Sequence, residues 1–255
     1  MWIDTHTHLD SLESVEEAVK NAELNKVSKI ITIGTGKNDH FKVLELSKKY
    51  KNVYCTLGVH PHEAENFDPE TESFMLSHLT DPKVVGVGEI GLDYYYDNAP
   101  KELQKEVFKR QLQIAKDFNL PVEIHAREAE DDIVALLTEF KGQVSGIIHC
   151  FSGSQNFANE VLSLGYNLSI SGIVTFKKAD QLRDIVKNTP VDRLHIETDA
   201  PYLTPIPFRG KKNQPSYVVY VAEKVAEIKN LSLDELSKQL QKNTHSLFKK
   251  IKEGE

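Results

Sequence analysis

The sequence begins MWIDTHTHLD (residues 1–10), a short β-rich run that ends in two histidines, and similar combinations recur along the chain. In an extended strand alternate side chains share a face, so Asp4, His6 and His8 point the same way with neighbours roughly 7 Å apart. Two imidazoles on one face can hold one metal ion. A single His-x-His pair also arises by chance, so the rest of the chain has to decide between these interpretations.

Short β-rich runs alternate with longer helical segments, because the hydrophobic pattern switches repeatedly between the two periods. The eight β-rich runs are residues 1–6, 29–34, 53–59, 83–90, 120–125, 145–150, 166–171 and 193–198. Helices are predicted over residues 14–25, 39–50, 69–79, 101–118, 128–140, 154–164, 179–187 and 215–229. Ser14 with Glu17, a capping box, and Ser154 mark two of the helix starts. Residues 231–251 repeat apolar residues at helical spacing and predict an added C-terminal helix.

This alternation predicts one (β/α)₈ barrel domain over residues 1–255, an α/β fold with an added C-terminal helix. Such a barrel needs about 250 residues, and no linker of biased composition or charge block divides the chain. A doubly wound open sheet is the structural alternative. It is disfavoured because no glycine-rich phosphate-binding loop follows any predicted strand.

Composition and charge exclude several classes of protein. The chain has no apolar run of about 18 residues and no signal-peptide pattern, so we expect a cytoplasmic location and no membrane partner. A formal net charge of -7 provides no global basic field that would gather nucleic acid. An anionic substrate must therefore be held locally, by metal or by individual cations. Cys55 and Cys150 are too few for a disulfide framework and are predicted to be free thiols.

Side chains able to bind a metal ion stand at the ends of six predicted strands. The C-terminal strand ends of a barrel share one face, so these side chains converge around a single mouth. Burying so many titratable groups without a balancing cation would be costly, and we therefore expect a metal centre. Imidazole and carboxylate ligands suit Zn²⁺, Mn²⁺ or Fe²⁺, and Mg²⁺ becomes possible with further carboxylate and water. The residues are His6, His8, His60, His62, Glu89, His125, His149 and Asp199.

The candidate ligands outnumber those that one tetrahedral ion uses. Two ions about 3.5–4 Å apart need a bridging carboxylate. Glu89 is the predicted bridge because it is the acid at the end of the fourth strand, among glycines that allow close backbone approach. The partition that this suggests, which spacing alone does not prove, is one ion on His6, His8 and Asp199 and the other on His125 and His149.

Six motifs in fixed order carry a family resemblance. They are DTHTHLD (4–10), GVHPH (58–62), GEIGLDY (88–94), the helix FKRQLQIAKDFNLPV (108–122) with the HAR that follows it, HCFSG (149–153) and ETDAPYL (197–203). Together they resemble the TatD family of metal-dependent deoxyribonucleases, within the amidohydrolase-like barrel superfamily, over essentially the whole chain. The resemblance implies a divalent-metal centre and phosphodiesterase activity on DNA, often a 3′-to-5′ exonuclease. It implies as metal ligands His6, His8, Glu89, His125, His149 and Asp199.

The expected mechanism is hydrolysis by water that a divalent cation activates, since such water can have its pKa lowered to about 7. Glu89 would bridge two cations, of Mg²⁺, Mn²⁺ or Zn²⁺, and Asp199 would accept or relay the proton of the water. His60 is assigned to phosphate contact or to protonation of the leaving group. The alternative for His60 and His62 is hydrogen bonding to a carboxylate that binds metal.

Other residues are predicted to bind substrate or to support the ligands. His62, Arg127 and the loop residue Arg209 are candidate phosphate contacts, and the alternative for Arg127 is an ion pair with Glu197. Glu123 and Glu197 are expected to face the barrel interior as partners of the ligands. Exposed aromatic rings among residues 94–96 could stack on bases, although at least one is expected to pack on the barrel.

We therefore expect a metal-dependent hydrolase whose partner is DNA with single-stranded ends, acting as a monomer or weak homo-oligomer. The alternative is a barrel metallohydrolase that acts on a small phosphoester, amide or lactone. The two remain open at this point because metal ligands say little about substrate.

Overall fold

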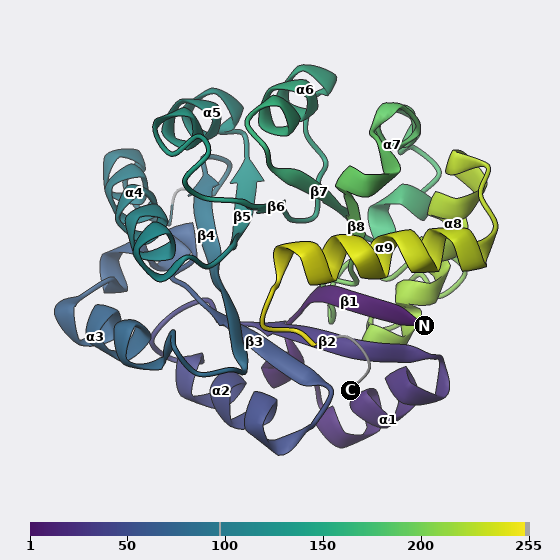
Figure 1. The fold of residues 1–255 in the computed structure, drawn as a ribbon, viewed down its shortest axis with the longest axis horizontal. Coiled ribbons are helices and arrows are strands. Elements are labelled where there is room, and N and C mark those ends of the chain that lie inside the picture. Colours follow the sequence, from purple (N-terminus) through teal and green to yellow (C-terminus); the bar gives the residue numbers. More distant parts are fainter. Residues whose placement is uncertain (97, 253–255) are drawn as a thin grey trace.

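The computed structural model describes residues 1–96 and 98–252 and contains an eight-stranded parallel sheet rolled into a barrel (Figure 1). The strands pair in chain order. Two backbone hydrogen bonds close the barrel: the amide of Asp199 donates to the carbonyl of His6 at 2.9 Å, and the amide of His8 donates to that of Ala200 at 2.8 Å. The strands are β1 (Trp2–Thr7), β2 (Val27–Ile33), β3 (Val53–Leu57), β4 (Val84–Asp93), β5 (Val122–Arg127), β6 (Gly146–Ile148), β7 (Asn167–Ile170) and β8 (Leu194–Ile196).

Helices follow the strands and pack around the outside of the barrel, as Figure 1 shows. The main apolar core lies between strands and helices. None of the helices in the described ranges is both long and apolar enough to cross a lipid bilayer. The helices are α1 (Val15–Leu24), α2 (His40–Lys49), α3 (Pro69–His78), α4 (Lys101–Phe118), α5 (Glu130–Glu139), α6 (Gln155–Ser163), α7 (Asp180–Asn188), α8 (Val218–Lys229) and α9 (Leu233–Leu247). The predicted (β/α)₈ barrel with an added helix is confirmed.

Helix starts follow the capping signals in the sequence. Ser14 accepts the amide N–H of Glu17 at 3.3 Å, and Ser154 accepts that of Phe157 at 3.1 Å. At Ser14 only this half of the predicted capping box is seen among the described residues, whereas both halves form at Ser232 and Glu235. That complete box starts α9 at Leu233, two residues later than predicted.

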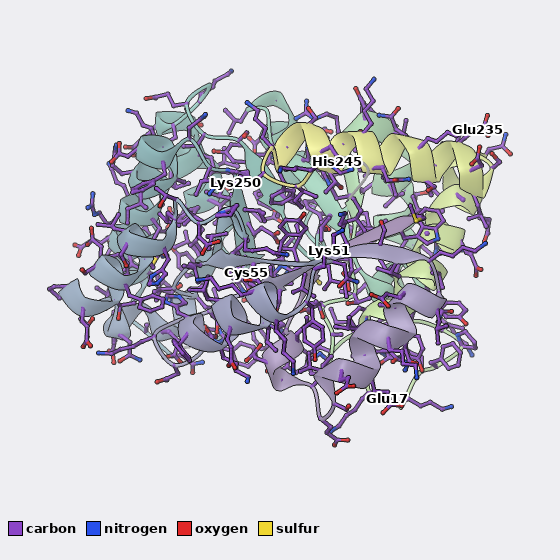
Figure 2. All side chains as sticks on the ribbon, turned by 60° about the horizontal axis from the view of Figure 1, so that its bottom comes forward. Glu17, Lys51, Cys55, Glu235, His245 and Lys250 are labelled. Atoms are coloured by element: carbon purple, nitrogen blue, oxygen red, sulfur yellow. The ribbon has the colours of Figure 1, made fainter. Side chains whose placement is uncertain are left out.

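Helix α9 and the segment after it close the end of the barrel where the strands begin. The Ser237 hydroxyl donates to the carbonyl of Met1, and Asn243 donates to that of Leu194 at the start of β8, each at 2.8 Å. Phe248 and Ile251 are buried in a cluster with side chains from β2, β3, β4 and β6. Figure 2 shows Glu235 at one end of α9 and His245 and Lys250 toward the other.

Candidate metal centre

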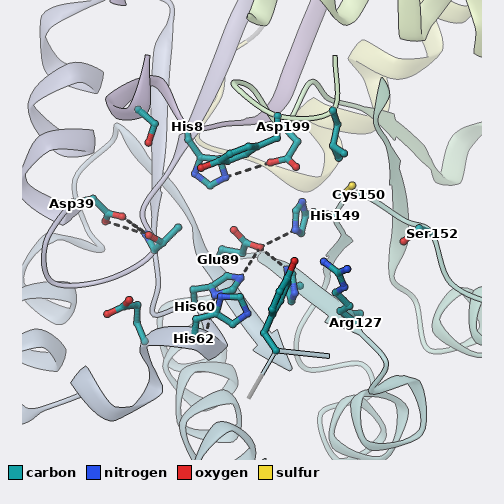
Figure 3. A pocket seen from close by; sticks show the side chains of 18 of the residues that line it. His8, Asp39, His60, His62, Glu89, Arg127, His149, Cys150, Ser152 and Asp199 are labelled. Atoms are coloured by element: carbon teal, nitrogen blue, oxygen red, sulfur yellow. Dashed lines mark hydrogen bonds and ion pairs between the residues drawn. The ribbon is translucent and has the colours of Figure 1, made fainter. Parts of the chain in front are cut away.

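The predicted ligands gather around one cavity of about 790 Å³ at the opposite end of the barrel, where the strands end (Figure 3). His6 lies fully buried beneath the cavity, next to Glu89. The convergence expected for strand ends of a barrel is therefore found. The predicted residues that line the cavity are His8, His60, His62, Glu89, Arg127, His125, His149 and Asp199.

Glu89 lies at the centre of the cluster, with its carboxylate 3% exposed. Its Oε1 atom lies 2.8 Å from His149 Nε2, 2.9 Å from His125 Nδ1 and 3.5 Å from His60 Nε2. Its Oε2 atom instead faces His6, whose Nε2 is 3.6 Å away. Burial alone would raise the pKa of Glu89, but the charges of His149 and His60 and the hydrogen bonds from His125 and His149 hold it well below its usual range. Glu89 therefore presents one carboxylate oxygen to His60, His125 and His149 and the other to His6.

Two glycines of β4 allow this central position. A Cβ atom added to Gly88 would lie 2.7 Å from the Cβ of Glu123, and one added to Gly91 would lie 2.0 Å from the carbonyl oxygen of His125. Gly91 also has a φ of +140°, which L side chains rarely adopt. The close approach of β4 to β5 brings Glu89 beside His125 and confirms the reason expected for these glycines.

His6, His8 and Asp199 form one group of candidate ligands. His6 Nδ1 is bonded to Glu123 Oε2 at 2.8 Å, while its Nε2 is buried and has no hydrogen-bond partner. That Nε2 points between Glu89 Oε2 at 3.6 Å and Asp199 Oδ1 at 3.9 Å, and His8 Nε2 lies 3.4 Å from the same Asp199 oxygen. A buried, unpartnered imidazole nitrogen flanked by two carboxylates fits a divalent cation, which would take its lone pair and balance both charges.

Carboxylates lie on the far side of two imidazoles that are candidate ligands. Glu123 is bonded to His6, and Glu197 Oε1 lies 3.4 Å from His149 Nδ1. Both acids are fully buried, as expected for residues that face the barrel interior. Acids in this position fix which ring nitrogen faces the metal. Glu123 is hydrogen-bonded to His6 of β1, and not to His125, which lies two residues after Glu123 on β5.

Asp93 is a candidate functional residue that the sequence patterns did not indicate. Its Oδ2 accepts hydrogen bonds from His125 Nε2 at 2.9 Å and from His62 Nε2 at 3.0 Å. Its Oδ1 accepts the amide N–H groups of Tyr95 and Tyr96, each at 3.0 Å. Burial by itself would raise the pKa of Asp93, but these hydrogen bonds lower it. The available signal was strand parity, since Asp93 stands four residues after Glu89 on the same strand face.

The buried acids favour positive charge beside them, and they raise the pKa values of the adjacent histidines. Although burial and the charge of His149 lower the pKa of His6, its hydrogen bond to Glu123 and the nearby carboxylate of Glu89 raise that pKa to about 10. The pKa of His149 is likewise raised by Glu89 and Glu197 against the effect of its burial. Asp4 does not join the cluster: its carboxyl accepts from the Thr198 amide at 2.9 Å, and burial raises its pKa to about 8.

His60 and His62 were expected to share one face of the third strand, and this expectation is wrong because neither residue lies on a strand. Strand β3 ends at Leu57, and Pro61 begins a 3-10 helix because its fixed φ suits the first helical position. In this turn His60 Nδ1 accepts the amide N–H of His62 at 3.1 Å, so its Nε2 carries the proton and faces Glu89. Burial lowers the pKa of His60 to about 3.

Of the two predicted arginines, the structure brings one to this cavity. Arg127 lies at its edge, with the guanidinium carbon 4.1 Å from the ring centroid of Tyr95 and 4.8 Å from that of Tyr96. Arg209 is not among the described residues that line it. Its guanidinium donates to the carbonyl of Thr204 at 3.0 Å and stacks on Phe176 at 4.1 Å.

Three further expectations concern Tyr94, Glu197 and the cysteines. The Tyr94 hydroxyl donates to Asp132 at 2.5 Å, so this ring packs on the barrel while the next two tyrosines are exposed. Glu197 accepts the amide of Cys150 at 2.7 Å, and the ion pair with Arg127 is not formed among the described residues. Both cysteines are free, as predicted.

A family model described as TatD related DNase matches residues 3–249. The chain is 42% identical over 253 residues to YabD of Bacillus subtilis (strain 168), an uncharacterized metal-dependent hydrolase, with 98% of this chain and 99% of YabD covered. It is 38% identical over 253 residues to YcfH of Escherichia coli (strain K12), also an uncharacterized metal-dependent hydrolase, with 96% and 95% covered. The crystal structure of YjjV, a TatD homolog from Escherichia coli K12, matches with a TM-score of 0.92 at 32% identity, covering 97% of this chain and 98% of that one.

Proposed function

The chain belongs to the TatD-related DNase family of metal-dependent hydrolases, and from this premise we propose that it hydrolyses phosphodiester bonds of DNA. We propose a 3′-to-5′ exonuclease that acts on single-stranded ends in the cytoplasm, as a single-domain monomer or weak homo-oligomer. The observation that carries the proposal is the carboxylate of Glu89, one of whose oxygens faces His125 and His149 while the other faces His6. This is the arrangement that a pair of bridged cations requires.

We assign the ligands from these two groups. One cation would be held by His6, His8, Asp199 and Glu89, and the other by His125, His149 and Glu89. When bound, Mg²⁺, Mn²⁺ or Zn²⁺ would activate water for attack on phosphorus and neutralise charge on the phosphate oxygens. The hydrogen bonds that Glu123 accepts from His6 and that Asp93 accepts from His125 support this assignment, since they leave the opposite ring nitrogen for the cation.

Asp199 takes the proton of the attacking water in this mechanism. Burial would raise its pKa, but the hydrogen bond and charge of His8 lower it, so the carboxylate is ionised and able to accept a proton at neutral pH. Its side chain also borders the cavity, where substrate must bind. An Asp199→Asn variant that kept metal occupancy and near-normal turnover would remove Asp199 from this role.

His60, His62 and Arg127 contact the substrate. Because His60 accepts a backbone N–H at Nδ1, its Nε2–H is a donor, which favours contact with a phosphate oxygen over metal binding. His62 is held at the cavity by Asp93. The guanidinium of Arg127 is oriented by two tyrosine rings, and its planar fork matches phosphate.

Hydrolysis of end-labelled single-stranded DNA by metal-stripped protein tests the proposal. The protein is supplied separately with Mg²⁺, Mn²⁺ and Zn²⁺, and parallel substrates labelled at the 5′ or the 3′ end report the direction of attack. We expect cleavage from the 3′ end that requires added metal and is lost in Glu89→Ala. If no metal restores cleavage although its binding is demonstrated, DNA is the wrong substrate, and a small phosphoester, amide or lactone becomes the alternative.

A further inference from the structure

A second cavity of about 240 Å³ opens beside the metal centre, between the loops that follow β6 and β7. Ser152 and Ile173 line both cavities, so the two cavities adjoin each other. From this shared wall the second cavity extends over Phe176 to Lys178 and Gln181. The space available to a substrate at the mouth of the barrel is therefore larger than the metal-centre cavity alone.

Charge is distributed unevenly around the mouth of the barrel. Asp10, Asp39 and Glu63 line the metal-centre cavity on the side of β1 to β3. In Figure 3, Asp39 lies on one side of Glu89, while Arg127 and Ser152 lie on the other. An extended polyanion that enters the metal centre is therefore repelled on the first side and finds cations on the second.

The second cavity itself combines an aromatic wall with positive charge. Phe176 is only partly buried, and the guanidinium carbon of Arg209 lies 4.1 Å from its ring centroid. Lys178 is an exposed cation at the same cavity. Two acids lie nearby, and both have partners: Asp180 of α7 pairs with Arg183 at 2.6 Å, and Glu130 accepts the amide and the hydroxyl of Ser154 at 2.8 and 2.6 Å. Aromatic faces that stack on bases, set among cations that meet phosphates, are typical of sites for single-stranded nucleic acid.

We propose that this second cavity binds the single-stranded DNA that flanks the scissile phosphodiester, with a base against Phe176 and phosphate contacts from Lys178 and Arg209. The inference rests on the proposed hydrolysis of DNA and adds the path of the strand, from the metal centre across Ser152 and Ile173. It also gives Arg209 a substrate contact outside the cavity that holds the metal ligands.

The length of the bound strand tests this path. Affinities of the metal-loaded protein for phosphorothioate oligonucleotides of two and eight nucleotides are measured by fluorescence anisotropy. Phe176→Leu keeps an apolar side chain but loses the stacking face, so it should weaken binding of the longer strand about tenfold. Lys178→Ala should reduce the dependence of log affinity on log salt by about 0.7. Neither variant should change affinity for the dinucleotide or turnover of bis(4-nitrophenyl) phosphate.

Lys177→Ala is the matched control, because Lys177 is an exposed neighbour that does not line the cavity. The subsite is overturned if Phe176→Leu and Lys178→Ala bind the longer strand as the wild type does, if they lose affinity for both lengths equally, or if the control behaves like them. Cleavage of unmodified DNA is read separately. Its absence would overturn the proposed hydrolysis, whereas the length dependence of binding decides the subsite.

Discussion

Asp93 shows how one residue can tie two parts of a site together. One oxygen fixes His125 and His62, and the other fixes the backbone of Tyr95 and Tyr96 at the cavity rim. The sequence analysis found residues of ligand type by their position at strand ends, and it found Glu123 as a support. The contacts of Asp93 could not be predicted, because position within a strand indicates which face a side chain takes but not which imidazole of another strand it will meet.

Replacing Asp93 tests this role. Asp93→Asn keeps the shape and can still accept the two amides, but its NH₂ group cannot accept the imidazole protons. Loss of such a partner typically costs 10- to 100-fold in metal affinity or activity, and we expect a loss of about that size in metal affinity measured by competition with a chelator. Thermal unfolding serves as the control for folding. Wild-type affinity and turnover in a folded variant would show that His125 needs no such support.

A second residue, His195, should govern stability in acid. It is fully buried on β8, where Asn167 donates to its Nε2 at 3.0 Å, and burial lowers its pKa from 6.5 to about 3. As the pH falls through this window the unfolded chain binds a proton and the folded one does not, so the free energy of unfolding decreases by about 1.4 kcal/mol per pH unit.

Denaturant unfolding between pH 5.5 and pH 4 measures this linkage. We expect His195→Gln to reduce the slope of the free energy of unfolding against pH by about one proton. An unchanged slope would mean that His195 takes up its proton equally in the folded and unfolded states.

Among the elements, the strands and helices of the barrel could be predicted from the sequence more accurately than the conformations of the loops. Alternation of strand and helix patterns is local, so α4 occupies the predicted residues 101–118. The turn after β3 depends on Pro61 and on a hydrogen bond between His60 and His62, which strand periodicity does not encode. The placement of Arg209 on Phe176 depends on two loops meeting, and it could not be predicted from either loop alone.

The segment after α9 should contribute stability without affecting the site. The Lys250 ammonium donates to the carbonyls of Leu79, Asp81 and Val84 at 2.7, 3.0 and 2.8 Å. Lys250→Met leaves these carbonyls without their charged donor, so we expect the free energy of unfolding to fall by about 2 kcal/mol. Turnover per folded molecule should not change. Lys249→Met, at an exposed neighbour, is the control, and equal stability of the two variants would contradict the prediction.

In the whole molecule, the apolar cluster that closes the barrel and the candidate metal centre lie at opposite ends of the strands. Helix α9 and the buried Phe248 and Ile251 close one end, while Glu89 and its imidazoles occupy the other. Barrels of this type place their chemistry at the C-terminal strand ends. Substitutions at the closed end should therefore change unfolding and leave the metal centre intact.

The net charge of -7 also limits the affinity of the metal-free protein for DNA. Without a global basic surface, few counterions are released on binding, so duplex DNA should bind the metal-free protein more weakly than about 10⁻⁴ M at moderate salt. Fluorescence anisotropy with a labelled duplex in the presence of a chelator measures this affinity. A tight metal-free complex would show that protein cations, and not the metal centre, dominate recognition.

Metal stoichiometry and hydrolysis, measured on the same samples, test the Glu89-bridged centre most directly. Metal-stripped protein is titrated with Mn²⁺ while bound metal and cleavage of a single-stranded oligonucleotide are followed together, with Glu89→Gln in parallel. We predict that cleavage rises as the second equivalent binds and that Glu89→Gln loses both that equivalent and the activity. Full cleavage with one equivalent, or cleavage by the metal-free protein, would contradict a two-cation centre bridged by Glu89.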